Sequence, residues 1–120
     1  MSINPNLSSA ILGEVLAAYR DCDILAPRSV AMNERNLHFL ASSPVPRDEA
    51  IAIMRTAIGR NYNNFHADLL KLLPANAKVT LAREYSVCVY VGGKIRKNPR
   101  LEYSEFDYDP KSGMTRIWWD

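Results

Sequence analysis

The sequence lacks the features that mark several large protein classes. It holds two cysteines, Cys22 and Cys88, which form no CxxC pair, so neither a disulfide framework nor a cysteine zinc site is expected. Apolar runs such as Val87 to Val91 are far shorter than the ~20 residues that span a bilayer. The first residues have no basic stretch followed by an apolar core, which a secretory signal requires. We therefore expect a cytoplasmic protein with no membrane partner.

The sequence also lacks a large excess of either positive or negative charge. Fifteen Lys and Arg residues stand against thirteen Asp and Glu residues, a net charge of +2, so no overall field points to nucleic acid or anionic lipid. What the sequence has is an ordinary globular composition, 48% hydrophobic and 23% charged, in 120 residues. That length suits one folded domain, and we expect a single domain over residues 1–120.

Apolar residues recur at helical spacing through the N-terminal part of the chain and predict three helices, over residues 4–21, 46–59 and 61–73. The second is the best delimited, because Pro46 suits a first turn and Gly59 suits a C-terminal stop. Between the first two helices, residues 28–42 leave two alternatives open. We favour a short strand over Asn36–Leu40 above an irregular helix.

From Lys78 the apolar period changes to two, the pattern of a half-buried strand. It predicts strands over residues 78–91, 101–108 and 114–119. Arg83 is the one exception on the apolar face of the first strand, and Gly92-Gly93 is a two-residue turn signal. Helices followed by strands give an α+β fold. We expect about three N-terminal helices on one face of a C-terminal antiparallel β-meander of three or more strands.

Motifs that carry chemistry are absent. The sequence has no phosphate-binding glycine loop and no HExxH, CxxC, EF-hand or GxSxG motif, so we expect no cofactor, no metal and no catalytic residue. His38 and His66 could run acid–base chemistry near neutral pH, and a small metal-free hydrolase is one alternative. Nothing in the sequence places the two histidines together. Asp21-Cys22-Asp23 and Arg60–Asn64 are better explained as helix caps or surface clusters.

The most unusual feature is the order of charges near the C-terminus. Four bases fall within residues 94–100 and four acids within residues 102–109, with three aromatic residues among the acids. Such an edge is typical of a recognition surface, although opposite charges on neighbouring strands can be merely solvated. In a regular strand Tyr103 points away from Phe106 and Tyr108, so we expect an exposed Tyr103 and a core Phe106. The partner-binding candidates are Arg96, Lys97, Arg100, Glu102, Tyr103, Glu105 and Asp107.

These observations favour a non-enzymatic protein-binding module. An inhibitor, an immunity-type protein, an adaptor or an assembly subunit would fit, with another protein or a second copy as the partner. The first alternative is a nucleic-acid-binding protein, with phosphate contacts from Lys94, Arg96, Lys97 and Arg100 and stacking on Tyr90 and Tyr103. The acids that follow would repel the same phosphate backbone, so we rank this alternative second and the hydrolase third.

Overall fold

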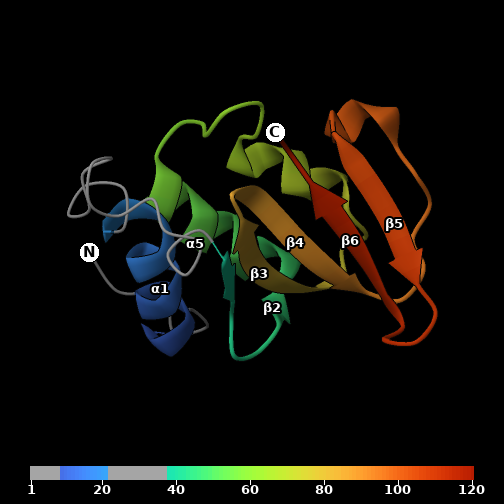
Figure 1. The fold of residues 1–120 in the computed structure, drawn as a ribbon, viewed down its shortest axis with the longest axis horizontal. Helices are drawn as coiled ribbons and strands as arrows, with labels where there is room; N and C mark the ends of the chain where they lie inside the picture. The colour runs from blue at the N-terminus through green and yellow to red at the C-terminus, as the bar shows by residue number, and fades with distance from the viewer. Residues whose placement is uncertain (1–8, 22–37) are drawn as a thin grey trace.

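The computed structural model describes residues 9–21 and 38–120 and shows a mixed α+β fold built on a six-stranded antiparallel sheet (Figure 1). The helical elements are α1 (Ser9–Leu16), the π-helix η1 (Ala17–Asp21) that continues it, α5 (Arg47–Ile58), and the short 3-10 helices η2 (Ala67–Leu72) and η3 (Pro99–Leu101). The strands are β1 (His38–Leu40), β2 (Val45–Pro46), β3 (Lys78–Glu84), β4 (Ser86–Gly92), β5 (Glu105–Asp109) and β6 (Met114–Trp118). The predicted α+β class is confirmed.

The second predicted helix is the most accurate of the three. α5 begins directly after Pro46, carries Asp48 and Glu49 in its first turn, and ends at Gly59, whose φ is 70°. Acidic side chains at the N-terminal end suit the helix dipole, and glycine takes a positive φ without steric cost. α1 and η1 agree with the first predicted helix where the structure describes it. None of the described helices is long and apolar enough to cross a membrane.

The helix predicted over residues 61–73 is wrong in its first half. The backbones of Tyr62 and Phe65 pair with each other at N–H···O distances of 2.8 and 3.0 Å. Asn63 takes a φ of 53° inside this tight turn, a conformation that Asn tolerates better than most residues. The Asn63 side-chain amide then donates to Ser86 Oγ (2.8 Å), which holds the turn against the sheet. Only the short η2 follows, so the third predicted helix shrinks to a 3-10 helix.

The long strand predicted over residues 78–91 is in fact a hairpin. β3 and β4 pair Arg83 with Val87 and Glu84 with Ser86, and Tyr85 alone makes the turn at a φ of 65°. When a turn consists of one residue, the residue numbers of each pair across it differ by an even number. Arg83 and Val87 therefore share a face, as they would in an unbroken strand. The alternation of apolar and polar residues therefore continues through the turn, so the sequence pattern does not reveal the turn.

The strand order also departs from the predicted meander. It is β1-β3-β4-β6-β5, with β2 also paired to β3, so β6 lies between β4 and β5. Gly92-Gly93 does not join two neighbouring strands, because Gly93, at a φ of 86°, opens a connection that passes through η3. Glu102 then takes a φ of 57°, and β5 begins only at Glu105. The predicted strand over residues 101–108 therefore starts too early.

Two other predicted strands are confirmed. β6 matches the closing strand expected over residues 114–119. β1 matches the strand favoured at residues 36–40, of which 36 and 37 lie outside the described residues. The strand alternative for this segment therefore holds where it can be seen.

One face of the sheet is buried against the helices, which lie beside and behind it in Figure 1. Its core residues occupy odd positions of β3, β4 and β6 and are fully buried: Val79, Leu81, Val87, Val89, Val91 and Ile117. Trp119 joins them, with its ring 4.7 Å from that of Phe65 and its indole N–H donating to Leu101 O (2.7 Å). Trp118 is half-buried, and its register partner Cys88 places it on the opposite face, as expected for neighbours on a strand.

Arg83, the exception on the apolar face, is itself only 1% exposed. Its guanidinium donates to Ala18 O (2.7 Å) and to the Tyr62 hydroxyl (2.5 Å), and it lies over the Tyr19 ring at 5.2 Å from the centroid. Tyr19 in turn donates to Ala82 O. A buried cation is tolerated when its donors are satisfied and aromatic faces surround it. Arg83 thus ties η1 and the turn at Tyr62 to the sheet.

Candidate functional site

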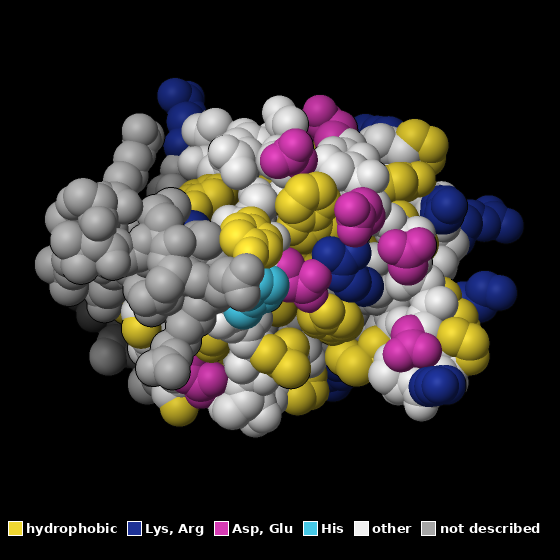
Figure 2. Space-filling view, viewed as in Figure 1, with side chains coloured by type: hydrophobic (Ala, Val, Ile, Leu, Met, Phe, Trp, Pro, Cys, Tyr) yellow, Lys and Arg dark blue, Asp and Glu magenta, His cyan; other side chains and the backbone are white. Residues whose placement is uncertain are grey.

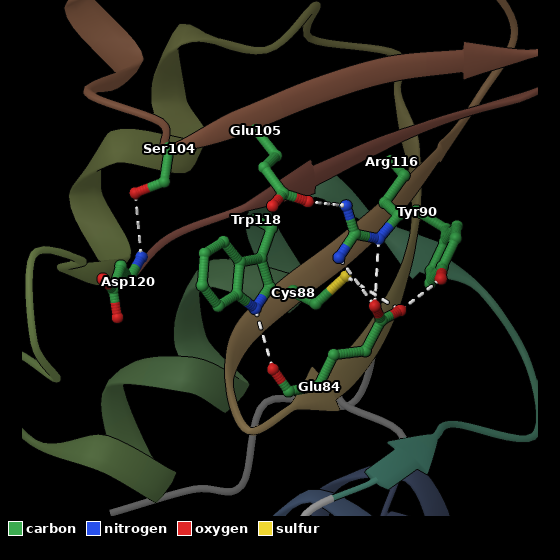
Figure 3. A network of polar contacts seen from close by, with 8 residues as sticks. All are labelled: Glu84, Cys88, Tyr90, Ser104, Glu105, Arg116, Trp118 and Asp120. Carbon is green, nitrogen blue, oxygen red and sulfur yellow. Dashed lines mark hydrogen bonds and ion pairs between the residues drawn. The ribbon is translucent and has the colours of Figure 1, made fainter.

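The face of the sheet turned away from the helices, called here the open face, carries a polar network centred on Glu84 (Figure 3). Arg116 donates to one Glu84 carboxylate oxygen from Nε (3.0 Å) and Nη2 (2.7 Å), and Tyr90 O–H donates to the other. The Cys88 thiol lies 3.5 Å from that second oxygen, and the Trp118 indole N–H donates to Glu84 O (2.8 Å). The network therefore joins β3, β4 and β6 across the open face.

This network fixes the protonation state of its members. Burial acts to raise the pKa of the Glu84 carboxyl, but hydrogen bonds from Arg116 and Tyr90 outweigh it and hold that pKa below its ordinary value. Burial raises the pKa of the Cys88 thiol, and the Glu84 carboxylate raises it further. Burial also raises the pKa of the Tyr90 hydroxyl, and its bond to Glu84 adds to the rise. An ionised carboxylate, a neutral thiol and a neutral phenol brace the sheet and supply no activated nucleophile.

β5 forms one edge of the sheet and carries acids on the open face. Its register places Glu105, Asp107 and Asp109 there, and all three are exposed, whereas Phe106 between them is buried. Glu105 accepts a hydrogen bond from Arg116 Nη1 (2.6 Å), which links β5 to the network. In Figure 2, acidic side chains gather over this part of the sheet. We call these three acids the acidic edge.

A groove of about 470 Å³ lies between the end of η2 and the connection that leads to β5. Its lining is mainly apolar with two basic residues, and consists of Leu72, Leu73, Pro74, Ile95, Arg96, Lys97, Asn98, Pro99 and Leu101. The lining includes two exposed cations and no acid. The Thr115 hydroxyl donates to Gly93 O (2.7 Å), so the connection begins beside a residue of the helix-covered face. We call this feature the basic groove.

The predicted partner-binding residues fall into two groups. Arg96 and Lys97 line the basic groove, and Glu105 and Asp107 belong to the acidic edge. The other two charged candidates, Arg100 in η3 and Glu102 directly after it, are exposed and link the two groups along the chain. The order of charges in the sequence therefore becomes a separation of charge on the surface.

Tyr103 is not the exposed anchor that a regular strand would make it. It lies before β5 begins, packs against the hydrophobic core, and its ring centroid is 5.0 Å from that of Phe106. The alternation breaks at Ser104, whose N–H donates to Trp118 O (2.8 Å) although Glu105 is the register partner of Trp118. Tyr108 is the more exposed aromatic at 38%, with Lys94 Nζ 5.7 Å from its ring centroid.

The two histidines lie in different places. His38 is exposed in β1, with its ring 4.8 Å from that of Tyr85, and it lines a hollow beside Glu84. His66 is exposed just before η2 and lines a hollow beside Arg60. The two hollows share no lining residue. The structure therefore does not bring the pair together, as a two-histidine acid–base site would require.

The expected stacking platforms of a nucleic-acid site are also engaged elsewhere. The Tyr90 hydroxyl is bound to Glu84, and the Tyr103 ring packs against Phe106. Neither ring lines the basic groove. The two rings expected to stack bases therefore do not lie beside Arg96 and Lys97, as the single-strand site predicted from the sequence would require.

The remaining sequence candidates carry no site. Cys22 and Asp23 lie outside the described residues, and Asp21 ends η1. Residues 60–64 follow α5 and lead into the tight turn at Tyr62 and Phe65. Cys88 is buried as a free thiol. Over residues 9–21 and 38–120, no three His, Cys, Asp or Glu side chains gather as a metal site requires.

Sequence reasoning missed the Glu84–Arg116 pair and the η2 side of the basic groove. Glu84 and Arg116 are separated by 32 residues and meet only because β6 inserts beside β4. Leu72 and Leu73 were recognisable as apolar helix residues, but their place beside Ile95 depends on the path of the connection through η3. No local signal marks either contact.

Comparisons of the chain with protein-family models, with curated proteins and with solved structures find no match. No family is therefore assigned, and no relative's activity is transferred to this chain.

Proposed function

We propose that the protein is a non-enzymatic binding module whose partner is another protein. An inhibitor, an immunity-type protein, an adaptor and an assembly subunit all fit this description. The observation that supports it is the division of charge between the basic groove, with two cations and no acid in its lining, and the acidic edge, with three exposed acids on one strand. Charge divided in this way orients a partner and raises the rate of encounter.

The groove also supplies the apolar contact that binding energy requires. Its apolar lining includes Ile95, Leu72 and Pro99, which an apolar side chain of the partner would cover. Interfaces draw most of their affinity from such buried anchors, while rim charges contribute orientation and specificity. In this proposal Arg96, Lys97 and Arg100 attract the partner's acids, whereas Glu105 and Asp107 attract its bases.

Tyr103 and Glu102 have supporting roles in the proposal. Tyr103 packs against Phe106 and so fixes the start of β5, and Glu102 turns the chain between the two charged surfaces. The proposal includes a single domain, a cytoplasmic location and no cofactor. The nucleic-acid and hydrolase alternatives receive less support, because the stacking rings are engaged and the histidines lie in separate hollows.

Site-specific photo-crosslinking in the source cells tests the proposal. A photoreactive residue replaces Arg96 in the groove, Asp107 on the acidic edge, or Thr56 on α5 as an exposed control. We expect one protein to be captured from both charged surfaces and not from Thr56. Capture alone decides nothing until the captured protein is purified and its affinity measured.

Charge reversal then gives the quantitative arm. The double variant Arg96→Glu, Lys97→Glu should weaken binding of the purified partner at least about tenfold, which is ~1.4 kcal/mol. Arg20→Glu, an exposed charge on η1, is the matched control and should leave affinity unchanged. Equal effects of the two variants, equal capture from Thr56, or capture of nucleic acid instead of protein would overturn the proposal.

A further inference from the structure

The outer edge of β5 has unused backbone groups. The Trp119 N–H donates to Val87 O (2.9 Å), so the odd-numbered residues at this end of β6 direct their backbone toward β4. Backbone groups of successive residues in a strand point to opposite sides, and the even-numbered residues of β6 therefore face β5. Their register partners there are the three acids. The N–H and C=O groups of Phe106 and Tyr108 consequently point outward, away from the sheet.

Among the described residues, no strand pairs with that edge. β5 ends the strand order, with β6 as its neighbour on the inner side. No backbone hydrogen bond formed outside the strands over residues 9–21 and 38–120 involves Phe106 or Tyr108. Edge strands with free backbone groups bind extended segments of other proteins by adding a strand to the sheet.

We propose that β5 binds its partner by strand addition, pairing through Phe106 and Tyr108 with an extended segment that carries Lys or Arg at every second position. This inference rests on the proposed function and names the partner's chemistry at the acidic edge. The alternating basic side chains lie on the open face, beside Glu105, Asp107 and Asp109. The side chains between them lie on the opposite face beside Phe106 and Tyr108, so apolar residues fit there.

The three acids of the acidic edge favour a basic segment over a second copy of this chain as the partner of β5. Pairing two β5 strands would place acid beside acid, which is destabilising in a sheet. Charged side chains on an edge protect a protein against indiscriminate strand pairing, and a basic segment is the one kind that they attract. Glu105 is already paired with Arg116 at 2.6 Å, and Asp109 accepts from the Lys111 N–H (3.0 Å). Asp107, exposed at the centre of β5, is therefore the key residue.

Amide hydrogen exchange with defined peptides tests the proposal. The probe is a capped peptide of alternating lysine and valine, and the matched control has the same composition with the lysines adjacent to one another. We expect the probe to slow exchange of the Phe106 and Tyr108 amides about tenfold or more, because they gain a hydrogen-bond acceptor. The Asp107 amide already faces β6 and should keep its exchange rate.

Charge variants separate strand addition from simple attraction. Asp107→Lys should weaken probe binding about tenfold or more, whereas Asp48→Lys should not, since Asp48 is also an exposed acid and lies on α5, outside the sheet. Unchanged thermal unfolding and NMR dispersion of Asp107→Lys establish that the fold is intact. Equal binding of both peptides, or binding without protection of Phe106 and Tyr108, would overturn strand addition. If the crosslinked partner still binds through the basic groove in that event, the proposed function survives and this inference alone fails.

Discussion

Replacing Glu84 with glutamine should destabilise the protein by about 1–2 kcal/mol at neutral pH. The carboxylate receives two donations from Arg116 and one from Tyr90, and hydrogen bonds to charged groups contribute ~1.5–3 kcal/mol. The Arg116 and Glu84 side chains are 24% and 28% exposed, so solvent screens part of the interaction. Glutamine also keeps the size of the side chain and one acceptor oxygen. The expected loss therefore lies around the lower end of that range and just below it.

Urea unfolding followed by tryptophan fluorescence measures this loss. The midpoint should fall while the slope stays constant, which indicates a change in stability without a change in the surface exposed. The same substitution in an Arg116→Met background should cost less than half as much, because the main donor to Glu84 is gone. This double-mutant cycle isolates the pair from the other contacts of each residue.

The pH dependence provides a second check. Hydrogen bonds lower the pKa of the Glu84 carboxyl in the folded protein, so its contribution is complete above the unfolded value of about 4.3. That contribution is lost as pH falls through the lower, folded pKa. The stability gap between wild type and Glu84→Gln should therefore be full at neutral pH and shrink in acid. Equal stability at neutral pH, or a gap that persists unchanged in acid, would refute the reasoning.

Three further predictions follow from the same structure. Phe106→Ala should lower the free energy of unfolding by about 3–4 kcal/mol, because Phe106 is buried. Tyr103→Ala should lower it by roughly half as much, because Tyr103 is half-buried. Equal losses in urea unfolding would contradict this ranking. Glu102→Gly should stabilise by about 0.5–1 kcal/mol, since Glu102 has a φ of 57°, and a lower melting temperature would count against it. In a Cys22→Ser variant, Cys88 should resist a disulfide reagent until the protein unfolds, because burial raises its pKa; rapid labelling of the native protein would show that the thiol is accessible.

The position of α5 was predictable from the sequence. Pro46 and Gly59 delimit α5 because each has a backbone preference that suits one end of a helix. The hairpin at Tyr85 was not predictable, since a one-residue turn leaves the alternation of side chains undisturbed. The place of β6 between β4 and β5 was also hidden, because neighbouring strands distant in sequence carry no local signal.

The candidate surface was predictable in its charges and not in its geometry. The bases and acids of residues 94–109 are exposed as expected, including Arg96 in the groove and Asp107 on the edge. The predicted orientation of Tyr103 was wrong because an irregular residue, Ser104, lies between it and the start of β5. The Glu84 network depends on the strand order, so it could be found only after the fold was known.

The strand order also has a consequence for synthesis. Among the described strands, β5 joins the sheet through β6, which follows it in the chain. A ribosome releases the N-terminal side first, so β5 emerges before the strand that anchors it. During that interval both of its backbone edges are open to other nascent chains. The charges of Glu105, Asp107 and Asp109 then keep the unpaired segment soluble and oppose its aggregation until β6 pairs with it.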